Sequence, residues 1–354
     1  TRYIIRANVR GGYLDDAVTL ILNLATVLIL IVGARRMETS SVLRAGDVIA
    51  VIQYVALIMN AVLMLSWTIA WLPHLRVSVR RIGEVLDLPS EESAASEHAT
   101  LSGDLVLSDV TFSYPGGEAP VLSDISFSVP RGEVVALIGG TGSGKSTLVK
   151  LLLDFYTPEE GSITFGGTDY RTLPRAAVRN NFSVALQKSM IFEGSVRDNV
   201  RMGNEKADDE EILRALDIAE MSPFLAMHEE GLDYRLAGAG TNISGGQKQR
   251  INIARALTKP AEVYIFDDSF SALDYLTESR LRQKLNRALE GKTQIVVTQR
   301  AATAMRCDRI FVLDGGRLVG AGRHEELLDS CTVYREIYDS QLGSKDAVKG
   351  GDAR

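Results

Sequence analysis

A glycine-rich segment at residues 139–147, GGTGSGKST, limits the possible folds of this chain more than any other feature. The apolar run EVVALIG precedes it and LVKLLLDFY follows it, which predicts a buried strand, a loop and a helix in that order. Glycines are needed because consecutive backbone N–H groups must turn inward to hold phosphate oxygens. The positive end of the following helix faces the same anion. The segment therefore predicts a phosphate-binding α/β domain of the P-loop kind.

The pattern also assigns roles within the loop. We expect Lys145 to contact the terminal phosphates and the hydroxyl of Ser146 to ligate Mg²⁺. The whole set of expected phosphate-binding residues is Gly139, Gly140, Thr141, Gly142, Ser143, Gly144, Lys145, Ser146 and Thr147. A flexible glycine loop without a ligand is the alternative, and the strand and helix around the motif argue against it.

Two further elements follow downstream. In AEVYIFDDSFSALD, residues 261–274, a hydrophobic strand ends in Asp267, where a nucleoside triphosphatase places a Mg²⁺ ligand. An acidic turn after a strand is the structural alternative. In NISGGQKQRINIARAL, residues 242–257, Ser244 precedes two glycines and a helical pattern, which predicts an N-cap and a second anion site. By itself, such a turn is more often structural.

The front of the chain has a different character. No charged residue occurs at positions 17–34 or 48–75. At about 1.5 Å per helical residue, each stretch is long enough to cross a hydrocarbon core of about 30 Å. Residues 1–88 therefore predict an all-α transmembrane hairpin in a lipid bilayer, with spans at about 17–34 and 48–72. A buried helical hairpin in a soluble protein is the alternative.

The flanking residues suggest an orientation. Trp67 and Trp71 lie near the end of the second span, where an aromatic belt is expected. Arginines at positions 76, 80 and 81 favour a cytoplasmic exit, although three arginines between the spans weaken the charge difference.

The boundaries and the net charge complete the outline. A linker rich in Ser, Ala and Glu is predicted at 89–102, followed by a soluble domain at 103–345 and a tail at 346–354. The net charge of −6 combines +3 up to Pro89 with −9 beyond it. A soluble domain of that sign lacks the basic surface of a nucleic-acid-binding protein, so we expect no nucleic-acid partner.

Together these motifs resemble those of ATP-binding cassette (ABC) exporter half-transporters, over essentially the whole chain. ISGGQ is similar to the signature sequence that separates cassettes from other P-loop proteins. The resemblance implies a P-loop fold with an antiparallel β subdomain, a helical subdomain at about 195–259, and ATP with Mg²⁺ as ligands. It also implies that the hairpin is the last two of six membrane helices. We therefore expect a fragment, with four helices before Thr1.

The resemblance assigns further residues. Tyr114 matches the aromatic residue that stacks on adenine, and Gln187 matches the Q-loop glutamine beside the Mg²⁺ site. A core aromatic and a solvated loop amide are their structural alternatives. Residues 271–274 match the D-loop. The signature residues, which contact a nucleotide across a dimer interface, are Ser244, Gly245, Gly246 and Gln247.

Two positions depart from family members that hydrolyse ATP efficiently. The Glu after the Walker B aspartate is Asp268 here, and the His at a later strand end is Gln299. Asp places its carboxylate about 1.5 Å further back, which weakens a step that depends on position. Gln can donate a hydrogen bond to the γ-phosphate but cannot carry the charge of His. The alignment also places Gly238 where the family has a Glu that contacts the transport domain.

We therefore predict the degenerate-site half of a heterodimeric exporter, paired with a second half-transporter that supplies Glu and His. The resemblance implies a slow ATPase site with catalytic positions Asp268, Gln299 and Gln187, and Mg²⁺ ligands Ser146, Gln187 and Asp267. It also implies a multi-pass protein of the inner (cytoplasmic) membrane with a cytoplasmic nucleotide-binding domain. An active homodimer and a regulatory ATP-binding subunit are alternatives, and the two spans argue against a soluble cassette that acts on nucleic acid. The sequence does not indicate the transported substrate.

Overall fold

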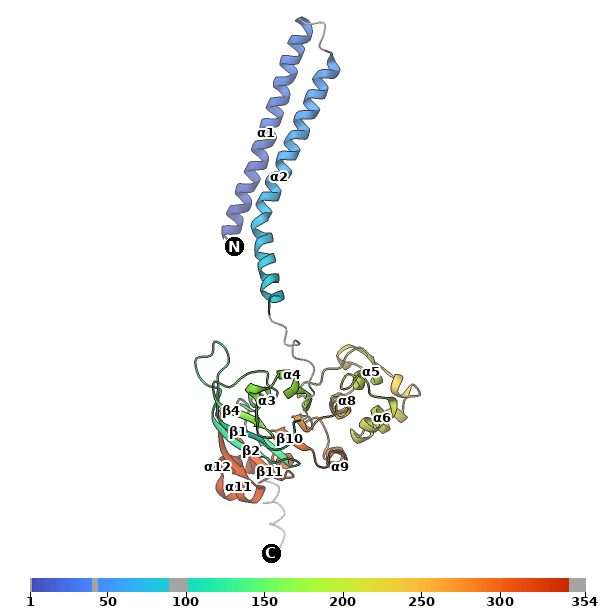
Figure 1. Cartoon of the computed structure of the whole chain (residues 1–354). Coiled ribbons are helices and arrows are strands. Elements are labelled where there is room, and N and C mark those ends of the chain that lie inside the picture. Colours follow the sequence, from blue (N-terminus) through green and yellow to red (C-terminus); the bar gives the residue numbers. More distant parts are fainter. Residues whose placement is uncertain (1, 40–43, 89–100, 344–354) are drawn as a thin grey trace. The chain divides into compact units, whose positions relative to one another are not determined.

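The structure is a computed structural model that describes residues 2–39, 44–88 and 101–343, in two units divided between residues 90 and 91. The first unit contains α1 (Arg2–Thr39) and α2 (Ala45–Leu86), which lie side by side (Figure 1). Both helices extend beyond the predicted spans, because a helix satisfies its own backbone hydrogen bonds whether its side chains are apolar or charged. Most of the predicted linker and the whole predicted tail lie outside the described residues.

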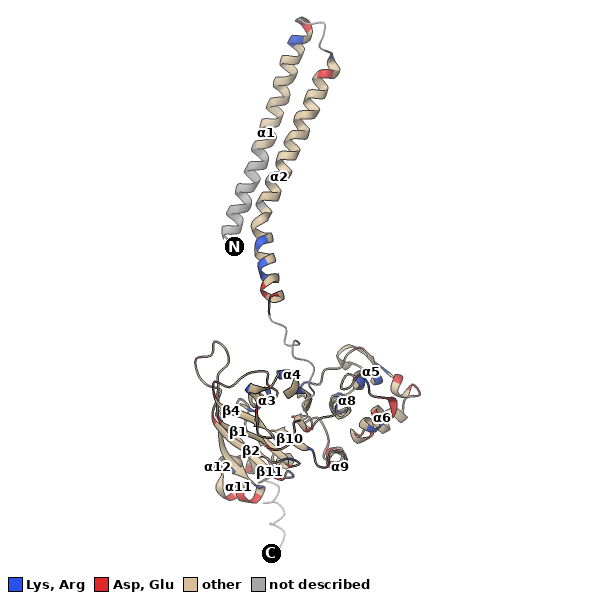
Figure 2. Cartoon of the chain, in the orientation of Figure 1, with Lys and Arg blue, Asp and Glu red and all other residues tan. Residues whose placement is uncertain are grey.

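The apolar side chains of this pair remain exposed in the chain. Two segments, Val18–Glu38 and Ala45–Leu86, are long and apolar enough to cross a membrane, and only 6% of each apolar window is buried. In Figure 2 the charged residues of the described parts lie toward the helix ends. Trp67 and Trp71 are 57% and 59% exposed. The described chain therefore does not bury this hairpin as a soluble core would.

The second unit is built around a six-stranded sheet with the order β12-β11-β3-β10-β9-β6. Five strands are parallel, and the edge strand β12 is antiparallel to β11. The central strands β9 and β10 are buried along their whole length, which explains their continuous apolar sequence. The strands are β3 (Val134–Ile138), β6 (Phe182–Ala185), β9 (Val263–Asp267), β10 (Thr293–Thr298), β11 (Arg309–Asp314) and β12 (Arg317–Gly322).

A second, antiparallel sheet has the order β2-β1-β4-β5. It shares one hydrophobic core with the parallel sheet and with the helix α3 (Lys145–Leu152), whose Leu148 is fully buried. Leu101, two residues before the predicted domain start, already packs into this core. The strands are β1 (Leu105–Phe112), β2 (Leu122–Val129), β4 (Glu160–Phe165) and β5 (Thr168–Asp169).

Helices pack around a second core, which also includes Phe266 of β9, Val296 of β10 and Leu281 of the later helix α9 (Tyr275–Ala288). Around this core, α5 (Val196–Arg201) and α6 (Asp209–Ile218) pack on α8 (Gly245–Thr258) (Figure 1). The short helix α7 (Ser222–Ala226) contacts α6. The short strands β7 (Gly194–Ser195) and β8 (Arg235–Leu236) pair antiparallel within this helical region. The remaining elements are η2 (Tyr170–Thr172), α4 (Arg175–Asn180), η3 (Gly231–Asp233), η4 (Gly238–Gly240), α9 (Tyr275–Ala288), α10 (Ala301–Ala304), α11 (His324–Ser330), α12 (Thr332–Tyr338) and η5 (Asp339–Gly343).

The register of the parallel strands positions the site. Ile138 of β3 pairs with Thr298 of β10, and Val297 of β10 pairs with Asp267 of β9. Three parallel strands therefore end at the same edge of the sheet, and their following loops meet there. The predicted fold class, a P-loop α/β domain with an antiparallel β subdomain and a helical subdomain after an apolar helix pair, is confirmed.

Candidate nucleotide site

The loops that follow β3, β9 and β10 line a cavity of about 290 Å³. Ligands of open α/β sheets bind at this carboxyl edge of the strands. Asp267, Gln187 and Gln299 come together there with the glycine-rich loop. The lining residues are Val121, residues 141–147, Gln187, Asp267, Asp268, Val297, Thr298 and Gln299.

Lys145 closes the glycine-rich loop on itself. Its Nζ donates to Gly139 O at 2.8 Å, to Gly140 O at 2.7 Å and to Ser143 Oγ at 3.2 Å. Two glycines are sterically required: a Cβ at Gly139 would lie 2.1 Å from Leu313 O, and Gly144 has a φ of +100°. The loop therefore presents an ammonium group and backbone N–H groups to one small volume, the arrangement that binds phosphate.

Charges in the cavity oppose one another. Burial lowers the pKa of Lys145, while the nearby carboxylates of Asp267 and Asp268 act to raise it. Burial raises the pKa of Asp267, the charge of Asp268 raises it further, and Lys145 opposes both effects. Asp267 is buried and Asp268 is half-buried, and a bound cation would relieve the repulsion between their carboxylates.

The same residues fit a magnesium ion. Ser146, Gln187 and Asp267 bring hydroxyl, amide and carboxylate oxygens to one cavity. Among the described residues, no group of three or more His, Cys, Asp or Glu is arranged to hold a metal. One or two carboxylates without a full protein cage suit Mg²⁺, which takes its other ligands from phosphates and water.

Asp268 has a strained backbone at the predicted water-activating position. Its φ is +46°, in the left-handed region that non-glycine residues rarely adopt. Burial raises the pKa of its carboxyl group, and hydrogen bonds from the Ser271 and Gln187 side chains, together with the charges of Arg300 and Lys145, act to lower it. Ser271 Oγ donates to the backbone O of Asp268 at 2.9 Å, which holds the loop of Asp268 beside the P-loop.

Tyr114 is not among the lining residues of the cavity, but it is connected to them. Its hydroxyl lies 3.0 Å from Thr147 Oγ1, and Lys150 Nζ lies 5.3 Å from its ring centre. The ring also packs edge-on against Phe112 and Tyr156. Both the adenine-stacking role and the core role predicted for this residue stay open.

The signature residues lie away from the cavity lined by the P-loop of the same chain. Ser244 is the N-cap of α8: its Oγ accepts from Gln247 N at 3.2 Å, and Gln247 Oε1 accepts from Ser244 N at 2.7 Å. Beside this capping box, Gly245 is exposed and Gly246 is half-buried at the positive end of the helix.

Gln249 is a connecting residue that the sequence analysis did not identify. Its side chain is 8% exposed, and it joins α8 to the D-loop. Its Nε2 donates to Ser271 Oγ at 3.0 Å, and its Oε1 accepts from Ala272 N at 3.0 Å. The helix around it, GGQKQRINIARALT, is mostly polar, so the sequence does not mark Gln249 as a buried amide that needs hydrogen-bond partners.

The family model for the ABC transporter matches residues 122–271, which run from β2 past the P-loop and the signature to the D-loop. The chain belongs to the ABC transporter family.

Several relatives of this ABC transporter chain match nearly all of it. An ABC transporter ATP-binding protein of Mycobacterium tuberculosis is 38% identical over 94% of the chain and 58% of the relative. The ATP-dependent lipid A-core flippase of Francisella tularensis is 34% identical over 92% of the chain and 53% of the relative. The solved structure of a bacterial Atm1-family ABC exporter with ATP bound matches at a TM-score of 0.77 and 28% identity, covering 94% of this chain and 59% of that one. The chain thus spans between half and two thirds of these proteins.

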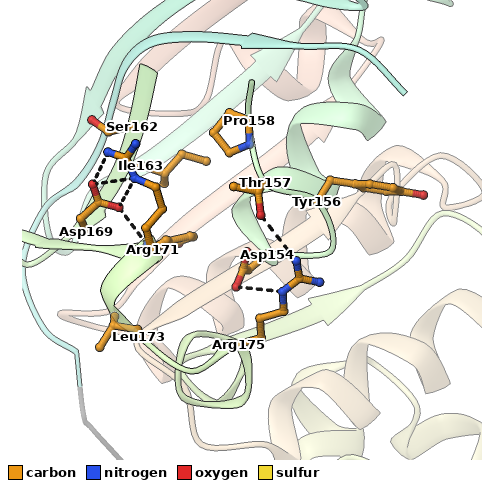
Figure 3. A pocket seen from close by; sticks show the side chains of 11 residues that line it. Asp154, Tyr156, Thr157, Pro158, Ser162, Ile163, Asp169, Arg171, Leu173 and Arg175 are labelled. Carbon is orange, nitrogen blue, oxygen red and sulfur yellow. Dashed lines mark hydrogen bonds and ion pairs between the residues drawn. The ribbon is translucent and has the colours of Figure 1, made fainter. Parts of the chain in front are cut away.

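A second cavity of the ABC transporter domain, shown in Figure 3, lies beside the loop after α3. Its charged side chains pair with one another: Arg171 with Asp169 at 2.6 Å, and Arg175 with Asp154 at 3.9 Å. None of the residues predicted to bind nucleotide is among its described lining residues. We therefore assign the nucleotide to the P-loop cavity.

The raised pKa of Asp267 predicts a pH-dependent effect on stability. A carboxyl group whose pKa is raised by folding contributes stability below its unfolded pKa, and that contribution is lost as the pH rises through the folded pKa. Asp267→Asn removes the ionisation, so we expect its Tm relative to wild type to increase as the pH rises from about 4 to 7. Thermal unfolding of the full chain in detergent without nucleotide or Mg²⁺ measures this.

Asp274→Asn is a control of opposite sign. Hydrogen bonds, first from the backbone N–H of Thr277, lower the pKa of Asp274 at the start of α9. Its stabilising effect is present above the unfolded pKa and lost as the pH falls through the folded pKa. The relative Tm of Asp274→Asn should therefore decrease as the pH rises from about 2 to 4 and stay nearly level from about 5 to 7. Parallel behaviour of the two variants would contradict the assigned shifts.

Proposed function

We propose that this chain is the ATP-binding half of an ABC exporter and that its own composite site turns ATP over slowly. The observation that carries the proposal is the P-loop cavity, in which Lys145, Asp267, Asp268 and Gln299 meet. Lys145 holds the terminal phosphates, and the oxygens of Ser146, Gln187 and Asp267 hold Mg²⁺, which neutralises phosphate charge when bound.

The slow turnover follows from Asp268 and Gln299. A general base must reach the attacking water at hydrogen-bond distance, and Asp268 is one methylene shorter than the glutamate of efficient family members. The backbone of Asp268 is also held in place, because its O accepts from Ser271 Oγ at 2.9 Å. Gln299 offers an amide to the γ-phosphate but no proton to transfer. The cavity is therefore suited to hold ATP more than to cleave it.

A dimer follows from the position of the signature. Exposed N–H groups at the start of α8 lie away from the P-loop cavity of their own chain, so they are available to a phosphate held by another P-loop. We propose a heterodimer in which a second half-transporter supplies Glu and His. The signature of this chain then completes the efficient site of its partner. A homodimer is the alternative, and it requires Asp268 to be a competent base.

The exposed apolar helices support a membrane location. We propose that α1 and α2 span the inner (cytoplasmic) membrane of a multi-pass protein, with the ABC domain in the cytoplasm. The names of the flippase and of the Atm1-family exporter support transport out of the cytoplasm as the process that ATP drives.

Ser244→Ala tests this arrangement. The signature acts on the partner's nucleotide, so we expect the variant to lower steady-state ATPase activity of the isolated pair by about 10-fold or more, while ATP bound to this chain's P-loop is retained. The tagged full chain is purified from its native membranes with whatever half-transporter accompanies it. ATPase activity and photolabelling by an azido-ATP are then measured on both chains.

Ser195→Ala is the matched control. Ser195 is also an N-cap with a capping box, at the start of α5, so it reproduces the structural cost of losing a cap. We expect nearly full ATPase activity from it. The heterodimer would be contradicted if this chain purified without any second half-transporter and still turned ATP over fast. Asp268→Ala would have to abolish that turnover.

A further inference from the structure

The loop between β10 and α10, which carries Gln299, is held by one side chain from much later in the chain. Gln341 lies in the π-helical turn η5. Its Nε2 donates to Gln299 O at 2.8 Å, and its Oε1 accepts from Ala301 N at 2.9 Å. The two ends of a single planar amide therefore bracket residues 299–301.

Gln341 caps the N-terminus of α10, because its side chain accepts a hydrogen bond that the N-cap residue does not. Ala301 N belongs to the first turn of α10, where N–H groups lack helical partners. Arg300, the N-cap residue of α10, makes no side-chain cap hydrogen bond. Its guanidinium instead reaches Glu278 Oε2 at 3.3 Å and Phe270 O at 3.4 Å. Phe270 and Glu278 thus hold the side chain of Arg300, and Gln341 holds the backbone on both sides of that residue.

Fixing this backbone fixes the direction of Gln299. The Gln299 side chain lines the P-loop cavity, and its Oε1 accepts from Thr141 Oγ1 at 3.4 Å. Once the carbonyl of Gln299 and the N–H of Ala301 are fixed, rotation about the ψ angle of Gln299 is lost, and its Cα–Cβ bond leaves the backbone in one direction. The hydrogen bond from Thr141 then fixes the end of the side chain. Gln299 is exposed, so its neighbours pack around it too little to set this direction.

We propose that Gln341 is a positioning residue that holds Gln299 toward the γ-phosphate, so that the pocket distinguishes ATP from ADP. This inference rests on the proposed function, in which the Gln299 amide meets the phosphate that ATP has and ADP lacks. Gln341 itself touches no nucleotide. Its effect is therefore confined to the γ-phosphate, which a purely structural role would not predict.

The test compares two nucleotides on one variant. Gln341→Met keeps the length of the side chain and removes both hydrogen bonds. Equilibrium binding of the imido analogue of ATP and of ADP, each with Mg²⁺, is measured on the full chain in detergent. We expect affinity for the ATP analogue to fall about 5- to 10-fold and affinity for ADP to stay unchanged. Gln299→Ala should give the same selective loss, and the double variant should add little to it.

Two further variants make the result specific. Gln341→Glu still accepts from Ala301 N but cannot donate to Gln299 O, so it should show the same selective loss. Ser340→Ala, whose Oγ donates to Ile337 O at 2.9 Å in the same turn, should leave both affinities unchanged. Equal weakening of both nucleotides by Gln341→Met, or an unchanged preference for the ATP analogue, would overturn the inference alone. A wild-type chain that bound neither nucleotide would instead overturn the proposed function, and this inference with it.

Discussion

Replacing Lys145 with alanine lowers the affinity of the full chain for MgATP by about 100-fold or more. The ammonium group is the positive side chain of the P-loop and donates to the carbonyls of Gly139 and Gly140, and we expect phosphate oxygens to replace these carbonyls when nucleotide binds. Removing one partner of a buried, hydrogen-bonded charge pair costs about 2–5 kcal/mol, which corresponds to roughly 30- to several-thousand-fold in affinity. Fluorescent ATP titration of the purified chain in detergent measures it.

Lys259→Ala is the matched control for this experiment. Like Lys145, Lys259 has a pKa lowered by burial, and its Nζ donates to a backbone carbonyl, Arg179 O at 2.9 Å. It lies outside the P-loop cavity. We expect a lower Tm but nearly unchanged ATP affinity. If the two variants lost affinity equally, the loss at Lys145 would reflect damage to the fold, and the assignment of the P-loop as the nucleotide site would fail.

The strands that were predicted from sequence are those with uninterrupted or alternating apolar runs between clear turns. β3 lies within EVVALIG, β9 lies within the run that ends in Asp267, and β10 ends just before Gln299, as the assigned strand end requires. Strands β6 and β12 were not predicted. The four residues of β6 follow Asn180 and Asn181, and β12 is an edge strand with two glycines. Short or half-exposed strands are specified by their neighbours in the sheet more than by their own residues.

Some residues of the site were predicted from the sequence pattern itself, some only by resemblance to a family, and some not at all. Lys145 and Asp267 belong to local patterns, in which a strand and its following residues define the chemistry. Gln187 and Gln299 were assigned by resemblance alone. The sheet order places β6 and β10 on either side of β9, and no short stretch of sequence predicts that order. Gln249 and Gln341 were missed, since an amide that bonds distant backbone atoms leaves no periodic pattern.

Replacing Asp268 with glutamate raises ATP turnover at this chain's own pocket by about 100-fold. The additional methylene moves the carboxylate forward by about 1.5 Å, and a displacement of about 1 Å can change such a step by about 100-fold. Burial already raises the pKa of this carboxyl group, which suits a general base. Glu is less favourable than Asp at a φ of +46°, so we expect a small decrease in Tm beside the gain in activity.

The measurement has to separate two sites in one dimer. In a Ser244→Ala background, the signature that completes the partner's site is disabled, and the remaining turnover belongs to the pocket of Asp268. Single-turnover hydrolysis of radiolabelled ATP by the purified pair then gives the rate of that pocket. Adding Gln299→His should increase the rate further, because His can carry the charge that an amide cannot. Asp329→Glu, on the exposed surface of α11, is the matched control and should leave the rate unchanged.

Three results are possible, and each decides between the proposals. If Asp268→Glu raises the hydrolysis rate, the length of the side chain at position 268 limits hydrolysis in this pocket, as expected for a degenerate site. Alternatively, the wild-type rate is fast, Asp268→Ala abolishes it and Asp268→Glu leaves it unchanged. The shorter carboxylate is then already a competent base, which supports the homodimer. A slow rate that neither substitution changes means that position 268 does not limit hydrolysis, and the slow turnover then arises from the loop of Gln299. In that last case Gln299→His alone should restore activity, because it is the remaining departure within the same cavity.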